Sequence, residues 1–95
     1  MSAAPGNHAA ASALRERLLT LVAQILGKPE SAASLPVDGR LSDLGMSSLK
    51  MVNLMLSVEV EFNVTIPQSD ITPDNFRSVA SVEALLLKLG VKPQP

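Results

Sequence analysis

The sequence contains no cysteine, no tryptophan and no tyrosine among its 95 residues. The absence of cysteine excludes disulfide bonds, thiolate metal sites and a cysteine nucleophile, so a core this small must be held by packing alone. Without tryptophan and tyrosine, the chain also lacks the side chains best suited to stacking on nucleic acid bases. Eight basic against nine acidic residues leave no surplus of positive charge to attract nucleic acids or anionic membranes. We therefore expect no nucleic acid partner.

Catalytic and metal-binding patterns are missing as well. The single histidine, His8, lies in an Ala-rich N-terminal stretch, and Asp38 and Asp43 have no recognisable relation to it. One histidine and scattered carboxylates provide neither a catalytic triad nor the ligand spacing of a metal site. The sequence therefore predicts a protein that is not an enzyme and has no catalytic residue and no metal ligand.

Long hydrophobic runs are also absent. No stretch approaches the roughly 18 consecutive apolar residues of a membrane span. Residues 1–13 lack the basic start and long apolar run of a signal peptide. We expect a cytoplasmic protein without stable membrane insertion. The hydrophobic content of 46% suits one small domain with an aliphatic core.

Helical periodicity is what the chain does contain. Apolar residues recur at helical spacing after Ser12, and Gly27 followed by Pro29 is a typical stop, which predicts a first helix over residues 13–26. The residues before it include no bulky apolar side chain after Met1, so little holds them to a core. The predicted division is a flexible leader, a folded domain and a C-terminal tail, over residues 1–11, 12–90 and 91–95.

Three further helices are predicted after a long loop over residues 28–46. Ser47 is placed to cap a central helix that runs to about Phe62. Thr72 before Pro73 indicates a short third helix, and Ser78 caps a final helix that ends at Gly90. The expected fold class is all-α, a small four-helix bundle with a long loop between the first two helices and a short third helix.

The central helix has apolar residues on two sides. One group consists of Met51, Leu54, Met55, Val58 and Phe62, and the other of Leu49, Val52, Leu56 and Val60. A helix needs only one such face to join a bundle. Two interpretations remain open at this point: neighbours bury both sides, or the second group, with Asn53, is a docking surface for a partner.

The run Leu44-Gly45-Met46-Ser47-Ser48-Leu49, followed by this apolar helix, resembles the acyl carrier protein family. The helix end Val58-Glu59-Val60-Glu61-Phe62 and the segment Val64-Thr65-Ile66-Pro67 extend the resemblance, which covers about residues 13–90. The order of helix, long loop, central helix, short helix and final helix is the same.

The resemblance implies that Ser48 carries covalent 4′-phosphopantetheine derived from coenzyme A, while Ser47 keeps the capping role. It implies a monomer that holds acyl groups as thioesters, a phosphoprotein of lipid or fatty acid biosynthesis. The implied partners are a phosphopantetheinyl transferase, a loading ligase, and downstream transferases or synthases. An anion on Ser48 suits the positive end of the helix that follows it.

The sequence departs from typical fatty acid carriers, whose central helix is acidic. The commonly acidic positions hold Ser47, Lys50, Asn53 and Val60. We therefore expect apolar contacts to contribute more than charge to recognition. The departure argues against a housekeeping fatty acid carrier and for a specialised one that serves specialised biosynthetic enzymes. The acid-poor motif and the segment Ile66-Pro67-Gln68-Ser69-Asp70-Ile71-Thr72-Pro73 are also similar to stand-alone bacterial carriers that ligases load with an amino acid, so an aminoacyl or peptidyl carrier is the alternative. A small helical interaction adaptor is the alternative from another class.

Overall fold

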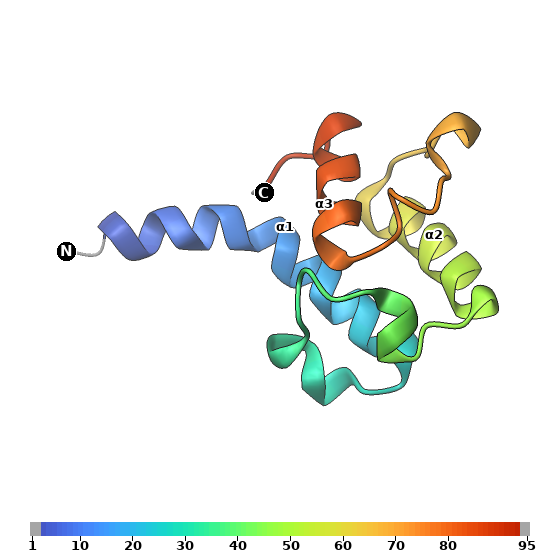
Figure 1. Cartoon of the computed structure of the whole chain (residues 1–95). Coiled ribbons are helices and arrows are strands. Elements are labelled where there is room, and N and C mark those ends of the chain that lie inside the picture. The colour runs from blue at the N-terminus through green and yellow to red at the C-terminus, as the bar shows by residue number, and fades with distance from the viewer. Residues whose placement is uncertain (1–2, 94–95) are drawn as a thin grey trace.

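A computed structural model describes the backbone of residues 3–93 and the side chains of residues 13–93. Three α-helices and three short 3-10 helices make up this part of the chain, which contains no β-strand (Figure 1). They are α1 (Ala3–Leu26), η1 (Pro29–Ser34), η2 (Leu41–Leu44), α2 (Ser48–Phe62), η3 (Gln68–Asp70) and α3 (Val79–Lys88). The prediction of an all-α fold is confirmed.

Helix α1 begins ten residues earlier than the predicted helix over 13–26. Its first part extends away from the domain, at an angle to its second part (Figure 1). At Leu14 the backbone N–H donates to the carbonyl of Pro93, at 2.9 Å, and an interrupted hydrogen-bond ladder is a common cause of such a bend. Alanine favours helix, and Pro5 lies in the first turn, where no N–H is needed. Helix formation therefore extends beyond the packed segment.

The core lies where α2 and α3 pack against the second part of α1. Leu18 and Val22 of α1 meet Leu54 and Val58 of α2 in a cluster that α3 completes. The buried residues from α3 are Val79, Val82, Leu85 and Leu86. Aliphatic side chains make up most of this cluster, as the composition predicted. Among the described helices, none is long and apolar enough to cross a membrane.

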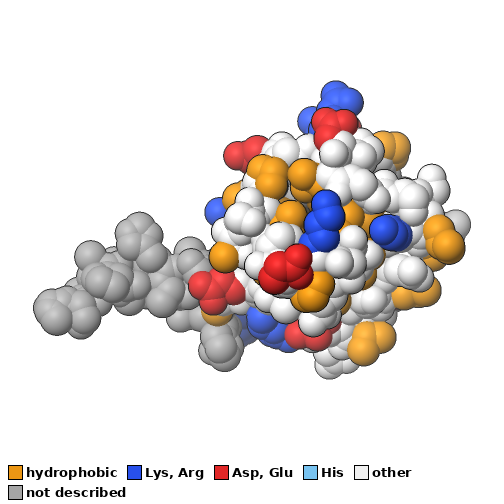
Figure 2. Space-filling model, turned by 90° about the horizontal axis from the view of Figure 1, so that it is seen from below, with side chains coloured by type: hydrophobic (Ala, Val, Ile, Leu, Met, Phe, Trp, Pro, Cys, Tyr) orange, Lys and Arg blue, Asp and Glu red, His pale blue; other side chains and the backbone are white. Residues whose placement is uncertain are grey.

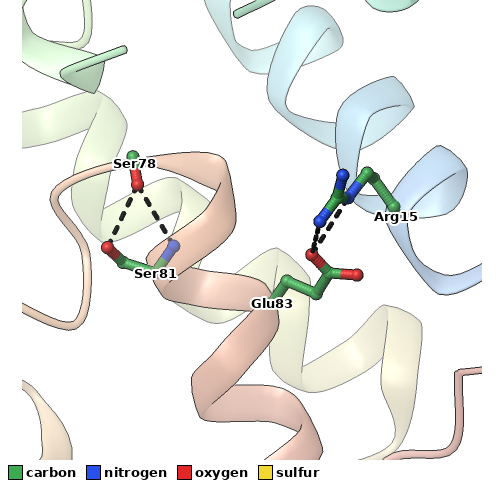
Figure 3. A network of polar contacts seen from close by, with 4 residues as sticks. All are labelled: Arg15, Ser78, Ser81 and Glu83. Carbon is green, nitrogen blue, oxygen red and sulfur yellow. Dashed lines mark hydrogen bonds and ion pairs between the residues drawn. The ribbon is translucent and has the colours of Figure 1, made fainter. Parts of the chain in front are cut away.

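Polar contacts fix α3 against α1 (Figure 3). The Arg15 guanidinium donates through Nε and Nη2 to the same Glu83 oxygen, at 3.0 and 2.6 Å. The Glu83 side chain is only 11% exposed, so this ion pair satisfies a carboxylate at the edge of the core. At the start of α3 the Ser78 hydroxyl accepts from the Ser81 N–H at 3.1 Å, which confirms the predicted cap.

The long loop over residues 28–46 packs onto the helices and includes η1 and η2. Its apolar anchor Leu41 is fully buried. Two backbone bonds connect it to the start of α3: the Leu41 N–H donates to the Arg77 carbonyl at 2.8 Å, and the Ala80 N–H donates to the Val37 carbonyl at 2.9 Å. The loop thereby holds the residues just before α2 in a defined position.

The predicted short third helix is replaced by turns over residues 73–76. The start signal itself is present, since the Thr72 hydroxyl accepts from the Asn75 N–H at 3.2 Å. The Asn75 side chain, however, donates backwards to the Asp70 carbonyl at 2.7 Å, and Phe76 is buried in the core. Side-chain bonds to the backbone compete with helix propagation in this way. The predicted start signal at Thr72 is therefore correct, but the residues after Pro73 form turns in place of the predicted helix.

Candidate functional site

A glycine turn brings the chain from η2 to the start of α2. Gly45 has φ +101°, a left-handed conformation that glycine adopts at little cost. This turn lets the Met46 N–H donate to the Leu41 carbonyl at 3.0 Å and places the Met46 side chain in the core. The two serines that follow are therefore anchored on the N-terminal side by a buried residue.

Ser47 and Ser48 have different structural roles. The Ser47 hydroxyl accepts from the Lys50 N–H at 3.2 Å, which confirms it as the N-cap of α2. Ser48 is the first helical residue and is exposed. Within residues 3–93 the N–H groups of Ser48 and Leu49 have no acceptor, as expected for the first turn of a helix. A phosphodiester on Ser48 therefore fits, because free N–H groups and the positive helix end favour an anion there.

The second apolar group of α2 lies on the surface. Leu49 is 72%, Val52 45%, Leu56 57% and Val60 83% exposed. We call these four residues the outer stripe. Asn53, the fifth predicted docking residue, is exposed beside them. Figure 2 shows hydrophobic side chains at the surface on the right-hand side of the molecule, where α2 lies in Figure 1. The interpretation that neighbours bury both sides of this helix is wrong.

Both carboxylates of α2 are engaged inside the protein. Glu59 accepts from the Ile66 N–H at 2.8 Å and so holds the segment that follows the helix. Glu61 pairs with Arg17 of α1, Nη2 to Oε2 at 3.2 Å. Both acids of α2 thus have a partner within the molecule, a cation for Glu61 and a backbone N–H for Glu59.

A groove of about 600 Å³ lies along α2 on the side of the helix that carries Met51 and Met55. Met51 and Met55 of α2 face Ile71 and Phe76 across it, and Arg40 and Arg77 are at its rim. The sequence did not predict this groove, because its walls come from segments distant in the chain. Both methionines are half-buried, so each contacts the core and also lines the groove.

Catalytic groups do not gather around Ser48. The described side chains include no histidine, because His8 lies outside them. Within those same side chains, no group of three or more potential metal ligands occurs. The arrangement can hold and present a group attached to Ser48, and it offers no base to activate the hydroxyl within the domain.

Known proteins resemble the chain over most of its length. Residues 16–86 match a family model described as a phosphopantetheine attachment site. Aminoacyl carrier protein 1 of Bradyrhizobium diazoefficiens is 47% identical over 78% of this chain and 82% of its own length. Aminoacyl carrier protein 2 of the same organism is 42% identical over 84% of this chain and 90% of its own.

Solved structures agree with these relatives. One crystal structure contains a Bradyrhizobium japonicum glycine:[carrier protein] ligase with its cognate carrier protein and an analogue of glycyl adenylate. The match has 47% identity and a TM-score of 0.65, and it covers 78% of this chain and 96% of the matched chain. A second crystal structure contains the Bradyrhizobium japonicum ligase with the glycylated carrier protein. This match has 49% identity and a TM-score of 0.62, and it covers 75% of this chain and 96% of the matched chain.

These similarities bear on the three functions that the sequence left open, an acyl carrier, an aminoacyl carrier and an adaptor. They favour the aminoacyl alternative over the acyl-specific interpretation, and none supports a role in lipid or fatty acid biosynthesis. A match over most of the domain also decides against the adaptor hypothesis. The chain belongs to the phosphopantetheine-binding carrier proteins, and is a non-catalytic carrier with covalently attached 4′-phosphopantetheine.

Proposed function

We propose that this protein is an aminoacyl carrier, with the 4′-phosphopantetheine arm on Ser48 and an amino acid bound to the arm as a thioester. The main support is the 47% identity to aminoacyl carrier protein 1, which spans 78% of the chain. The crystallised relatives, one of them glycylated, suggest a small cargo such as glycine.

Ser48 provides the attachment oxygen, and its exposure leaves it accessible to a phosphopantetheinyl transferase, the partner that would modify it. Ser47 keeps α2 capped whether or not its neighbour is modified, since its hydroxyl is already bonded to the Lys50 N–H. The bound arm supplies a terminal thiol, the one reactive sulfur that a chain without cysteine cannot provide itself. The free N–H groups of the first turn stabilise the phosphodiester charge.

The outer stripe is the proposed contact surface for the ligase that loads the arm. Its four apolar side chains begin directly beside Ser48, and the two carboxylates of α2 already have partners within the molecule. Exposed apolar patches on small proteins mark partner sites. Recognition by this surface depends on shape and burial, so we expect the loading rate to change little with ionic strength.

The experiment is a loading assay on the phosphopantetheinylated protein. It is incubated with ATP, glycine and the Bradyrhizobium glycine:[carrier protein] ligase, and intact mass is recorded. We expect a mass increase of one glycyl group that hydroxylamine removes. A parallel reaction replaces glycine and its ligase by a fatty acid and an acyl carrier ligase. Acylation there, without glycylation in the first reaction, would contradict the proposal and support the acyl carrier interpretation.

A further inference from the structure

The outer stripe continues from α2 onto α1. Its distal end opens into a surface notch of about 330 Å³, with Leu21 of α1 on one wall and Leu56, Ser57 and Val60 of α2 on the other. Leu21 is half-buried and packs on the core cluster, so its position is fixed. Two helices therefore present apolar side chains to the same small hollow.

The charges at the notch cancel within the protein. Glu61 lines the notch. The Arg17 guanidinium donates to a carboxylate oxygen of Glu61 and also, at 2.8 Å, to the backbone carbonyl of Glu61. The Arg17 guanidinium also lies over the Phe62 ring, 4.6 Å from the centroid, which limits its movement. A notch with apolar walls and an internally paired rim complements an uncharged, apolar group, and it penalises a charged one.

The notch lies well away from the modified serine. Leu56 and Val60 follow Ser48 by eight and twelve helical residues, which corresponds to about 12 and 18 Å along the axis of α2. A contact at this distance fixes the direction of the helix as well as its position. A partner held at both places would receive the arm at one defined angle.

We propose that the notch receives one bulky apolar side chain of the amino acid:carrier-protein ligase, so that α1 contributes to the loading interface together with α2. The inference rests on the proposed function and adds to it a second anchor point. Side chains that fill such pockets dominate the binding energy of interfaces, and the neutral rim excludes water around them. The ligase is the fitting occupant because the continuous surface leads from the notch to Ser48 at the base of the arm, and the two solved structures hold related carrier proteins in complex with such a ligase. A second copy of the chain on this surface would cover Leu49, next to the serine.

The test measures kcat and KM for glycylation of the holo protein by the Bradyrhizobium ligase. Leu21→Ala and Val60→Ala remove opposite walls of the notch. Each is expected to raise KM about 5- to 10-fold with kcat nearly unchanged, the pattern of a lost docking contact. Leu87→Ala is the matched control, since Leu87 is 43% exposed on α3, and its KM should equal that of the wild type.

The double variant Leu21→Ala/Val60→Ala tests whether the two residues act in one notch. If they do, its KM rises little beyond that of either single variant, because contacts to one shared site are not additive. A rise equal to the product of the two single effects would overturn the shared notch. Unchanged KM in both single variants would overturn the proposal altogether.

Two further measurements keep the outcome clear. Ser57→Phe fills the notch from its exposed side and should raise KM without lowering the melting temperature, which covers the case that Leu21→Ala unfolds the domain. Intact mass confirms the arm on every variant.

A wild-type holo protein that the ligase fails to glycylate would overturn the proposed function and this inference together, whereas normal loading of every notch variant would overturn only the inference. A wild-type dimer in light scattering that Val60→Ala dissociates would assign the notch to a second copy and overturn it too.

Discussion

The two sides of α2 carry the same kind of residue and have opposite surroundings. Leu54 and Val58 are fully buried against α1 and α3, whereas Leu56 and Val60, two residues further along in each case, are 57% and 83% exposed. The two sides carry the same types of side chain. They differ only in the direction in which these side chains point from the helix. The inner side contributes its apolar area to folding, and the outer stripe keeps its area in water, available to a partner.

The comparison supports the proposed placement of the recognition surface on the outer stripe. A stripe on the same helix as the attachment serine is rigid, because the inner side of that helix is fixed in the core. The stripe therefore holds its position relative to Ser48. Under the proposed function, stability and recognition are separated by direction around one helix, so we expect substitutions that affect one without the other.

The largest expected effect separates the two leucines of α2. Leu54→Ala should lower the free energy of unfolding by about 3 kcal/mol, because it leaves a cavity in a fully packed core. Leu56→Ala should change it by less than about 0.5 kcal/mol. Urea unfolding followed by circular dichroism measures both. Equal losses would mean that the outer stripe is part of the core.

Polar side chains of α2 extend the comparison. Glu59→Ala removes the acceptor of the part-buried Ile66 N–H and should cost about 1–2 kcal/mol, because that donor is left unpaired. Glu61→Ala breaks an exposed pair with Arg17 and should cost less than about 1 kcal/mol. Thermal unfolding of the two variants, measured side by side, shows which substitution lowers stability more. A larger loss for Glu61→Ala would contradict it.

The two serines at the start of α2 give a smaller difference in stability. Ser47→Ala should cost about 1 kcal/mol, since it removes the acceptor of the Lys50 N–H. Ser48→Ala removes no hydrogen bond made by the Ser48 side chain within residues 13–93, and should leave stability within about 0.5 kcal/mol. Chemical denaturation distinguishes the two, and a larger loss for Ser48→Ala would show that the capping assignment is wrong.

The smallest expected effect on folding belongs to the outer stripe itself. Leu56→Asp and Val60→Asp should each change the free energy of unfolding by less than about 0.5 kcal/mol, because both side chains are already largely exposed to water. Both should raise KM for loading by the ligase, since a carboxylate must be desolvated on docking. Circular dichroism and the loading assay are run on the same samples. Unfolding in either variant would contradict the assignment of the stripe to the surface.

The bounds of α2, its cap at Ser47 and the final helix could be predicted from the sequence, because they depend on local signals and apolar spacing. Exposure of the outer stripe could not, since periodicity gives direction around a helix and does not say which directions have neighbours. The extension of α1 before Leu14 was missed because it has no packing signal, only helix propensity. The notch at Leu21 could not be predicted either, because it forms only where α1 and α2 pack side by side.

The most direct test of the account is intact mass after incubation with coenzyme A and a broad-specificity phosphopantetheinyl transferase. The wild type and Ser47→Ala should each gain one phosphopantetheine group, and Ser48→Ala should gain none. Modification of Ser48→Ala, or loss of modification in a folded Ser47→Ala, would contradict the assignment of the arm to Ser48 and of the cap to Ser47.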